Sequence, residues 1–241
     1  CKRCLGDQTP FLNRFIQRSK LASIRPQVPA VTCTMQATYL TGRLPREHGI
    51  VGNGWYDREL AEHQFWKQSN HLVHGKKLWD TVRESKPNYT CAKLFWWYNM
   101  YSSADYSATP RPMYPADGRK VFDIYTHPMD LRESLKSELG PFPFHTFWGP
   151  GAGLPCSQWI ADCARSVEQR MRPDLSLIYL PHLDYNFQRF GPDLSKVSGD
   201  LREIDQLLED LVTYLENQEI QVILLSEYGI TPVSKAVHLN R

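Results

Sequence analysis

The chain has 241 residues, of which 41% are hydrophobic and 22% charged, so it is long enough to bury a large core as one α/β domain. Its formal net charge of +2 comes without a basic run, which leaves no electrostatic footprint for nucleic acid or an anionic membrane. No apolar run approaches the roughly 20 residues of a membrane span, no leading segment resembles a signal peptide, and the six cysteines are too sparse for a disulfide scaffold; we therefore expect a cytoplasmic protein, whose oligomeric state the sequence leaves open.

The first patterned segment is VTCTMQATYLTGRLPREHGIVGNGWYDRE, residues 31–59. Pro29 favours an extended chain before it, and CTMQATYLTG has the composition of a helix that ends at Gly42. We therefore expect Thr32 at the first helical turn, where free backbone N–H groups and the helix dipole favour an anion. A hydroxyl at this position is either an ordinary N-cap or a nucleophile, and the residues alone leave both open.

The middle of the chain, residues 95–155, is rich in aromatic residues, Pro and Gly and lacks a helical period. This composition predicts long loops or a small cap inserted over the sheet. Aromatic side chains in such a region either shape a substrate pocket or seal an irregular subdomain. Residues 158–171 then predict a helix, with its apolar face at Trp159, Ile160, Cys163 and Val167.

The last third of the chain predicts a βαβ unit. Residues 174–182 and 220–229 are short aliphatic runs that end in polar residues, as buried parallel strands do. Residues 198–217 have the period of an amphipathic helix, with apolar positions Leu201, Ile204, Leu207, Leu208, Leu211, Val212 and Leu215. With the helix before them, these elements predict an α/β fold of three layers, αβα, around a mostly parallel sheet.

Acidic residues follow both predicted strands. Asp184 comes after the first strand, with His182 and Gln188 near it, and Glu227 and Tyr228 follow the second. Since ligands of parallel sheets bind outside the carboxyl ends of the strands, we expect both carboxylates at one edge of the sheet. There they either hold a cation or serve as acid and base; alternatively, Asp184 caps a turn and Glu227 is a solvated loop residue.

Three segments, spread over about residues 24–233, resemble the nucleotide pyrophosphatase/phosphodiesterase branch of the alkaline phosphatase superfamily. Residues 31–59 follow the order of that family's nucleophile segment, LPHLDYNFQRFGPD resembles its Pro-Asp-x-x-Gly-His-x-x-Gly-Pro metal segment, and LLSEYGITPV resembles its Ser-Asp-His-Gly-Met segment. The resemblance implies a single alkaline-phosphatase-like domain over residues 1–241, with Thr32 as the nucleophile and Asn53 in contact with phosphate.

The resemblance also implies two divalent metal ions, usually zinc, with ligands at Asp184, Gln188, Glu227 and Tyr228. Gln188 and Tyr228 stand where the family has His, one in each of the two metal centres, and Glu227 stands for an Asp. Because zinc favours imidazole and thiolate ligands, the substitutions favour a harder ion such as magnesium, manganese or calcium. The family has a further metal-binding Asp before GDQTPFLNRF and a His beyond residue 241, so either ligands are lost or the sequence is a fragment, incomplete at both ends.

The implied reaction is the hydrolysis of a small phosphoester, of which nucleotides are one class. A metal ion would lower the pKa of the Thr32 hydroxyl, Asn53 and helix N–H groups would hold the phosphoryl charge, and a phospho-threonine would form. We expect Trp55, Tyr56 and the aromatic cluster at 95–101 to stack on a planar leaving group, with core packing as the alternative for Trp96 and Trp97.

Other activities remain as alternatives to this reaction. Sulfatases of the superfamily use a Cys-x-Pro-x-Arg motif, and the residues after Cys33 lack both the Pro and the Arg, which disfavours sulfatase chemistry. Phosphonate hydrolases share the Thr nucleophile. The altered ligands also allow a binding or scaffolding protein that keeps the fold without turnover.

Overall fold

The computed structural model describes residues 6–25, 27–235 and 237–238, so Cys1 and Cys4 lie outside the described residues. The strands are β1 (Gly54–Asp57), β2 (Glu62–Phe65), β3 (Cys91–Leu94), β4 (Tyr106–Pro110), β5 (Ile124–His127) and β6 (Leu175–Ile178). The helices are α1 (Pro10–Gln17), α2 (Thr32–Thr41), α3 (Pro45–His48), α4 (Leu78–Arg83), α5 (Leu131–Leu139), α6 (Leu154–Met171), α7 (Asp184–Phe190) and α8 (Leu194–Asn217).

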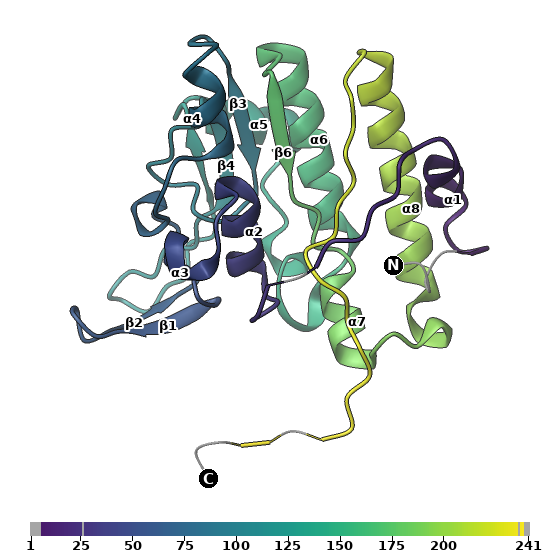
Figure 1. Ribbon diagram of the computed structural model, residues 1–241, viewed down its shortest axis with the longest axis horizontal. Coiled ribbons are helices and arrows are strands. Elements are labelled where there is room, and N and C mark those ends of the chain that lie inside the picture. Colours follow the sequence, from purple (N-terminus) through teal and green to yellow (C-terminus); the bar gives the residue numbers. More distant parts are fainter. Residues whose placement is uncertain (1–5, 26, 236, 239–241) are drawn as a thin grey trace.

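The central sheet has the strand order β5-β4-β3-β6 (Figure 1). β3 is parallel to both of its neighbours, with Ala92 opposite Tyr106 of β4 and Cys91 opposite Leu175 of β6, whereas β5 is antiparallel to β4. The sheet is therefore mostly parallel, as the sequence predicted. β1 and β2 form a separate antiparallel hairpin.

Helices cover both faces of this sheet because side chains alternate between its faces along each strand. Cys91 and Leu175 pack with Leu40 of α2 and Trp79 of α4 on one face. On the other face Ala92 and Ile178 pack with buried residues of α5 and α6. α8 packs against α6, and α1 against α8. This arrangement is the predicted three-layer α/β architecture.

Both long helices that the sequence predicted are present. α6 begins earlier than expected, at Leu154, and buries the whole predicted apolar face. α8 also begins earlier, at Leu194, because the Asp193 carboxylate accepts a hydrogen bond from Ser195 N and caps the helix. Its predicted apolar stripe is buried except for Leu208, which is partly buried.

The second strand of the predicted βαβ unit does not form, and that prediction was wrong. Residues 220–229 are extended and run beside α8 (Figure 1), but within the described chain their only backbone–backbone hydrogen bond joins Ile220 to the end of α8. Val222 and Leu224 pack inward, whereas Ile223 is 78% exposed. The alternation of side chains is that of a strand, but a strand also needs a neighbour that satisfies its N–H and C=O groups.

Residues 95–155 contain more regular structure than the predicted loops or cap. They contribute β4 and β5 to the sheet and α5 to one of its faces. The irregular segments of this region, 95–101 and 142–153, bring Trp97 and Trp148 together with near-parallel rings whose centroids are 6.5 Å apart. β4 escaped prediction because its sequence, YSATP, lacks the aliphatic run of a buried strand.

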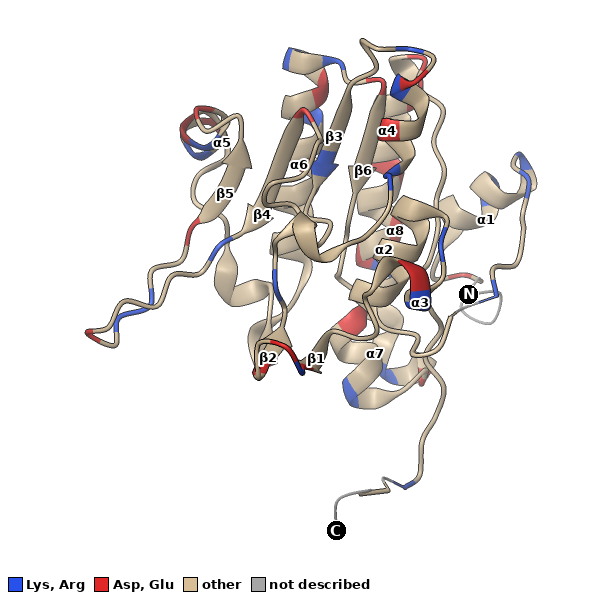
Figure 2. Cartoon of the chain, turned by 60° about the vertical axis from the view of Figure 1, so that its left-hand side comes forward, with Lys and Arg blue, Asp and Glu red and all other residues tan. Residues whose placement is uncertain are grey.

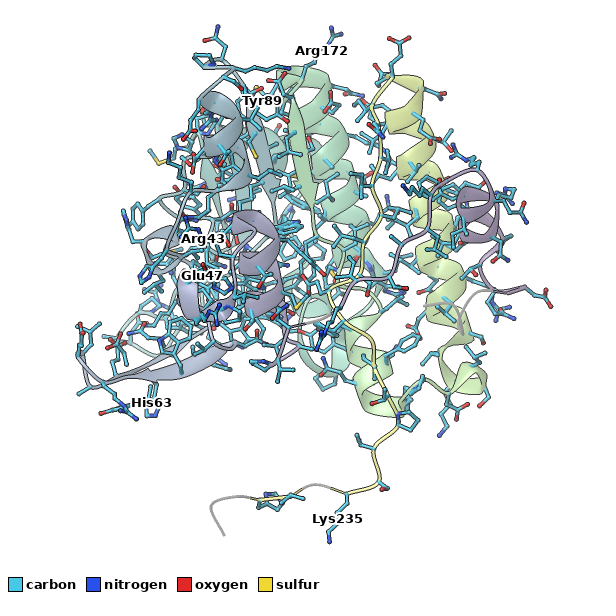
Figure 3. The ribbon with its side chains drawn as sticks, viewed as in Figure 1. Arg43, Glu47, His63, Tyr89, Arg172 and Lys235 are labelled. Carbon is cyan, nitrogen blue, oxygen red and sulfur yellow. The ribbon has the colours of Figure 1, made fainter. Side chains whose placement is uncertain are left out.

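Lys and Arg are interspersed with Asp and Glu over the surface (Figure 2). Ile230 still packs against the cluster that contains Phe187 and Leu201, residues 231–235 are exposed, and Lys235 lies far from the helices and strands (Figure 3). In the described part of the chain, no helix combines the length and the apolar character that a membrane crossing needs.

Candidate active site

A cavity of about 330 Å³ collects most of the predicted site residues. Tyr89 and Arg172, which precede β3 and β6, mark one end of the sheet (Figure 3), and the cavity lies at the other, where Trp97 and Tyr179 follow these strands. Predicted site residues in its lining are Thr32, Asn53, Asp184, Gln188 and Tyr228. The carboxyl ends of the strands therefore gather these side chains, as expected for a parallel sheet.

Thr32 is the first residue of α2, as predicted, and its side chain is buried. The N-cap position belongs to Val31, whose backbone is extended, and no side chain caps the helix there. The helix ends at Gly42, which adopts the left-handed conformation with φ of 64°. Thr32 therefore does not serve as the N-cap of α2.

The Thr32 hydroxyl is linked to Asp184 through one phenol. Tyr228 Oη donates a hydrogen bond to Asp184 Oδ1 at 2.8 Å and lies 3.4 Å from Thr32 Oγ1. A phenol has a single proton, and Tyr228 gives it to the carboxylate, so Thr32 is the donor toward Tyr228. Burial raises the pKa of Tyr228, which keeps the phenol protonated. The three side chains form a directed chain of hydrogen bonds from Thr32 to Asp184.

Glu227, the residue before Tyr228, is held by Gln36, a fully buried residue of α2. Gln36 Nε2 donates to Glu227 Oε1 at 2.6 Å, and Gln36 Oε1 accepts from Trp97 N at 2.8 Å. Burial raises the pKa of Glu227 to about 7, and the hydrogen bond from Gln36 offsets part of that effect. Sequence reasoning missed Gln36, because nothing in a helical pattern distinguishes a buried Gln that bridges two segments.

Asn53 holds the start of α2. Its Oδ1 accepts a hydrogen bond from Cys33 N at 3.0 Å, which satisfies one of the free N–H groups of the first helical turn. The amide NH₂ of Asn53 is a further hydrogen-bond donor in a residue that lines the cavity. The neighbouring Cys33 thiol is fully buried, and burial raises its pKa to about 12, so Cys33 is a core residue and not a second nucleophile.

The loop after β3 carries backbone strain next to the cavity. Phe95 and Tyr98 have φ values of 63° and 60°, a region that non-glycine residues rarely adopt. Lys93 Nζ donates to Tyr98 O at 2.8 Å, and Asn99 Nδ2 donates to Lys93 O at 3.0 Å, so buried polar groups hold the loop in place. This loop places Trp97 in the wall of the cavity.

Two predicted stacking residues are not brought to the cavity. Tyr56 is 54% exposed and contacts His63 edge-on, and Trp55 packs against the cluster that contains Cys33 and Trp97. The aromatic residues that do line the cavity are Trp66, Trp97, Phe147, Trp148, Tyr179 and Tyr185. Most of these come from segments far from residues 31–59, and only the folded chain reveals them. Trp96 packs in the core, the alternative expected for it.

The side chains of the cavity fit a divalent cation better than they fit a pair of zinc ions. Asp184 and the adjacent Glu227 supply two carboxylates, and none of the described lining residues is Lys, Arg or His. The other polar groups are hydroxyls and amides. Oxygen donors of this kind suit a hard ion such as magnesium, manganese or calcium, whereas the imidazole and thiolate groups that zinc prefers are missing from the described lining.

Solved structures define the class to which this fold belongs. Alkaline phosphatase PafA matches with a TM-score of 0.65 at 14% sequence identity, over 90% of this chain and 56% of that one. Phosphonoacetate hydrolase from Sinorhizobium meliloti, in complex with phosphonoacetate, matches with a TM-score of 0.55 at 13% identity, over 85% of this chain and 48% of that one. The chain therefore has an alkaline-phosphatase-like α/β fold, as its sequence predicted.

Within that class, residues 2–241 match the model of the type I phosphodiesterase / nucleotide pyrophosphatase family, and the chain belongs to this family of phosphoester hydrolases. An uncharacterized pyrophosphatase/phosphodiesterase of Schizosaccharomyces pombe is 26% identical over 236 residues, which cover 94% of this chain and 41% of the relative. The chain thus spans less than half the length of this curated relative. The resemblance stated from the three sequence segments is confirmed.

Proposed function

We propose that this chain carries the nucleophile and part of the metal site of a hydrolase that acts on a small phosphoester, with a nucleotide as one candidate substrate. Thr32 Oγ1 attacks phosphorus while the bond from phosphorus to the leaving-group oxygen breaks, so that a phospho-threonine forms and the leaving alcohol takes up the hydroxyl proton; water then hydrolyses the phospho-threonine. The amide NH₂ of Asn53 and the free N–H groups at the start of α2 bind the phosphoryl oxygens. The observation that carries the proposal is the hydrogen-bonded chain Thr32–Tyr228–Asp184 at a helix N-terminus, in one cavity with Asn53.

Asp184 and Glu227, with Gln188 and Tyr228, would hold one hard divalent ion. When bound, such an ion would supply positive charge that favours the alkoxide form of Thr32 and offsets charge on the phosphoryl group. The Tyr228 phenol oxygen accepts a hydrogen bond from the Thr32 hydroxyl and so fixes the direction of that hydroxyl. Aromatic walls formed by Trp97 and Trp148 exclude water and offer a flat apolar surface to a leaving group.

The test is hydrolysis of bis-(p-nitrophenyl) phosphate by the chain and its variants, with magnesium, manganese, calcium and zinc added separately. Thr32→Ala is expected to lower metal-dependent release of p-nitrophenol by about 10⁴-fold or more. Thr41→Ala, whose hydroxyl bonds Ala37 O at the other end of α2, is the matched control and should keep full activity. Activity that survives in Thr32→Ala would refute the role of this hydroxyl.

A binding or scaffolding protein is the second candidate, and the observation that favours it is Tyr228. Tyr228 stands where the family has a His ligand, and its phenol donates a hydrogen bond to Asp184 Oδ1. That oxygen is then less available to bind an ion. This candidate predicts that a folded sample binds the phosphodiester without releasing p-nitrophenol with any of the four metals. A phosphonate hydrolase is distinguished in a separate assay, by release of phosphate from phosphonoacetate.

A further inference from the structure

A second group of ligating side chains lies outside the cavity. Among the described residues, His182, Asp200 and Glu203 place one ligand atom each within 4.8 Å of one another. His182 belongs to the turn that joins β6 to α7, and the two acids are separated by three positions on α8, so they share one face of that helix. None of the three is among the residues that the family resemblance assigns to metal.

His182 is buried without a hydrogen-bond partner and points at the two acids. Its side chain is 1% exposed, and neither ring nitrogen makes a hydrogen bond. Nε2 nevertheless lies 3.1 Å from Glu203 Oε2 and 3.8 Å from Asp200 Oδ1. An N–H that bonded to one of these acids would point along the line to its oxygen; here Nε2 faces both oxygens and makes a hydrogen bond to neither.

The spacing fits a cation placed between the three groups. Two ligand atoms at zinc distances and at the tetrahedral angle are about 3.3 Å apart. The distances from His182 Nε2 to the two carboxylate oxygens, 3.1 Å and 3.8 Å, bracket this value. One imidazole and two carboxylates form the donor set of an open zinc site, in which water completes the coordination. Because an imidazole nitrogen takes part, a zinc-class ion is favoured over magnesium or calcium.

Neighbouring groups support the site and leave a path to it. Asn186 Nδ2 donates to Asp200 Oδ1 at 2.7 Å and so fixes the orientation of that carboxylate. The side chain of Glu203 is 52% exposed, which opens the site to solvent on the side of α8. We propose that His182, Asp200 and Glu203 bind one zinc-class divalent ion, which ties the turn before Asp184 to α8 and stands apart from the cavity with Thr32.

The experiment counts zinc ions by calorimetric titration of the metal-free chain. In Asp184→Asn/Glu227→Gln, which lacks the cavity carboxylates, one zinc ion is expected to bind and to raise the melting temperature. Adding Glu203→Gln should weaken this binding by about tenfold or more, and adding Asn186→Ala by about tenfold. Asp210→Asn, an exposed acid on the same helix, is the matched control and should leave the affinity unchanged.

The proposal is overturned if zinc does not bind to the Asp184→Asn/Glu227→Gln chain, or if Glu203→Gln leaves binding intact. Glu203 is half exposed, so its substitution leaves the fold in place. Should the double variant fail to fold, the wild-type chain gives the same answer, because Glu203→Gln should then reduce the number of bound zinc ions by one. Loss of this ion without loss of Thr32-dependent hydrolysis would separate the two sites.

Discussion

The two sides of the cavity are held by different means. Thr32 and Gln36 belong to α2, most of whose residues are buried against two hydrophobic clusters. Glu227 and Tyr228 belong to an extended segment that pairs with none of the described strands and leaves Ile223 largely exposed. Packing therefore fixes the side with Thr32, whereas Glu227 and Tyr228 on the other side are held by side-chain hydrogen bonds with Gln36 and Asp184.

The two sides of the cavity should therefore respond differently to substitution. A cluster of packed residues resists change at any one position by redistributing contacts, but a segment held by single hydrogen bonds fails when one partner is removed. Substitutions on the two sides of the cavity should therefore differ in their effects on stability and on activity.

The largest effect is expected from Lys93, beneath the loop that carries Trp97. Burial lowers the pKa of this fully buried amine to about 7. Between pH 7 and about 10.5 the unfolded chain holds a proton that the folded chain has lost, so the free energy of unfolding rises with pH across this window. Lys93→Met should remove a contribution of up to about 5 kcal/mol to that rise.

Urea unfolding at several pH values measures the slope. Tyr98 O keeps its bond from Asn70 Nδ2 in the variant, so the loop retains a partner. Lys86→Met, at an exposed position, is the control and should follow the wild type. An unchanged pH slope in Lys93→Met would show that Lys93 is charged in the folded protein and that this side of the cavity is less tightly packed than its burial indicates.

Gln36 joins the two sides and is the next test. Gln36→Met keeps the volume of the side chain but leaves Glu227 Oε1 and Trp97 N without their partner. Each unsatisfied buried group costs about 1–3 kcal/mol, so the loss of both partners should lower the free energy of unfolding by about 2–6 kcal/mol. Gln206→Met, at an exposed position on α8, should change it by less than about 0.5 kcal/mol. If chemical denaturation gave the same loss of unfolding free energy for Gln36→Met and Gln206→Met, the bridging role of Gln36 would be contradicted.

Asn53 tests catalysis apart from stability. Asn53→Asp keeps an oxygen that accepts from Cys33 N but lacks the NH₂ donor, so kcat should fall by about 10²-fold with little change in stability. Asn53→Ala lacks both groups and should also lose about 1 kcal/mol of helix capping. Steady-state kinetics and thermal unfolding of both variants measure the two quantities. A rate in Asn53→Asp equal to the wild type would remove Asn53 from phosphate binding.

The elements that the sequence predicted are those determined by local pattern. The apolar period of α6 and α8 and the glycine end of α2 follow from residues a few positions apart. The unpaired segment at 220–229 could not be foreseen, because its side-chain pattern says nothing about which strand lies beside it. Asp184, Glu227 and Thr32 could be predicted to share an edge, because each lies next to a predicted strand or helix end. Gln36 and Trp148 were missed, because they reach that edge from segments whose pattern does not show their neighbours.

The smallest effect is expected outside the cavity, at Tyr56. Tyr56→Ala removes an exposed ring that contacts His63, so KM for bis-(p-nitrophenyl) phosphate should change by less than about twofold and the free energy of unfolding by less than about 0.5 kcal/mol. Trp148→Ala removes a ring that lines the cavity, and it should raise KM by up to about tenfold through lost aromatic contact. A comparable rise in KM for Tyr56→Ala would mean that the β1–β2 hairpin reaches the substrate, and the boundary of the site would have to include it.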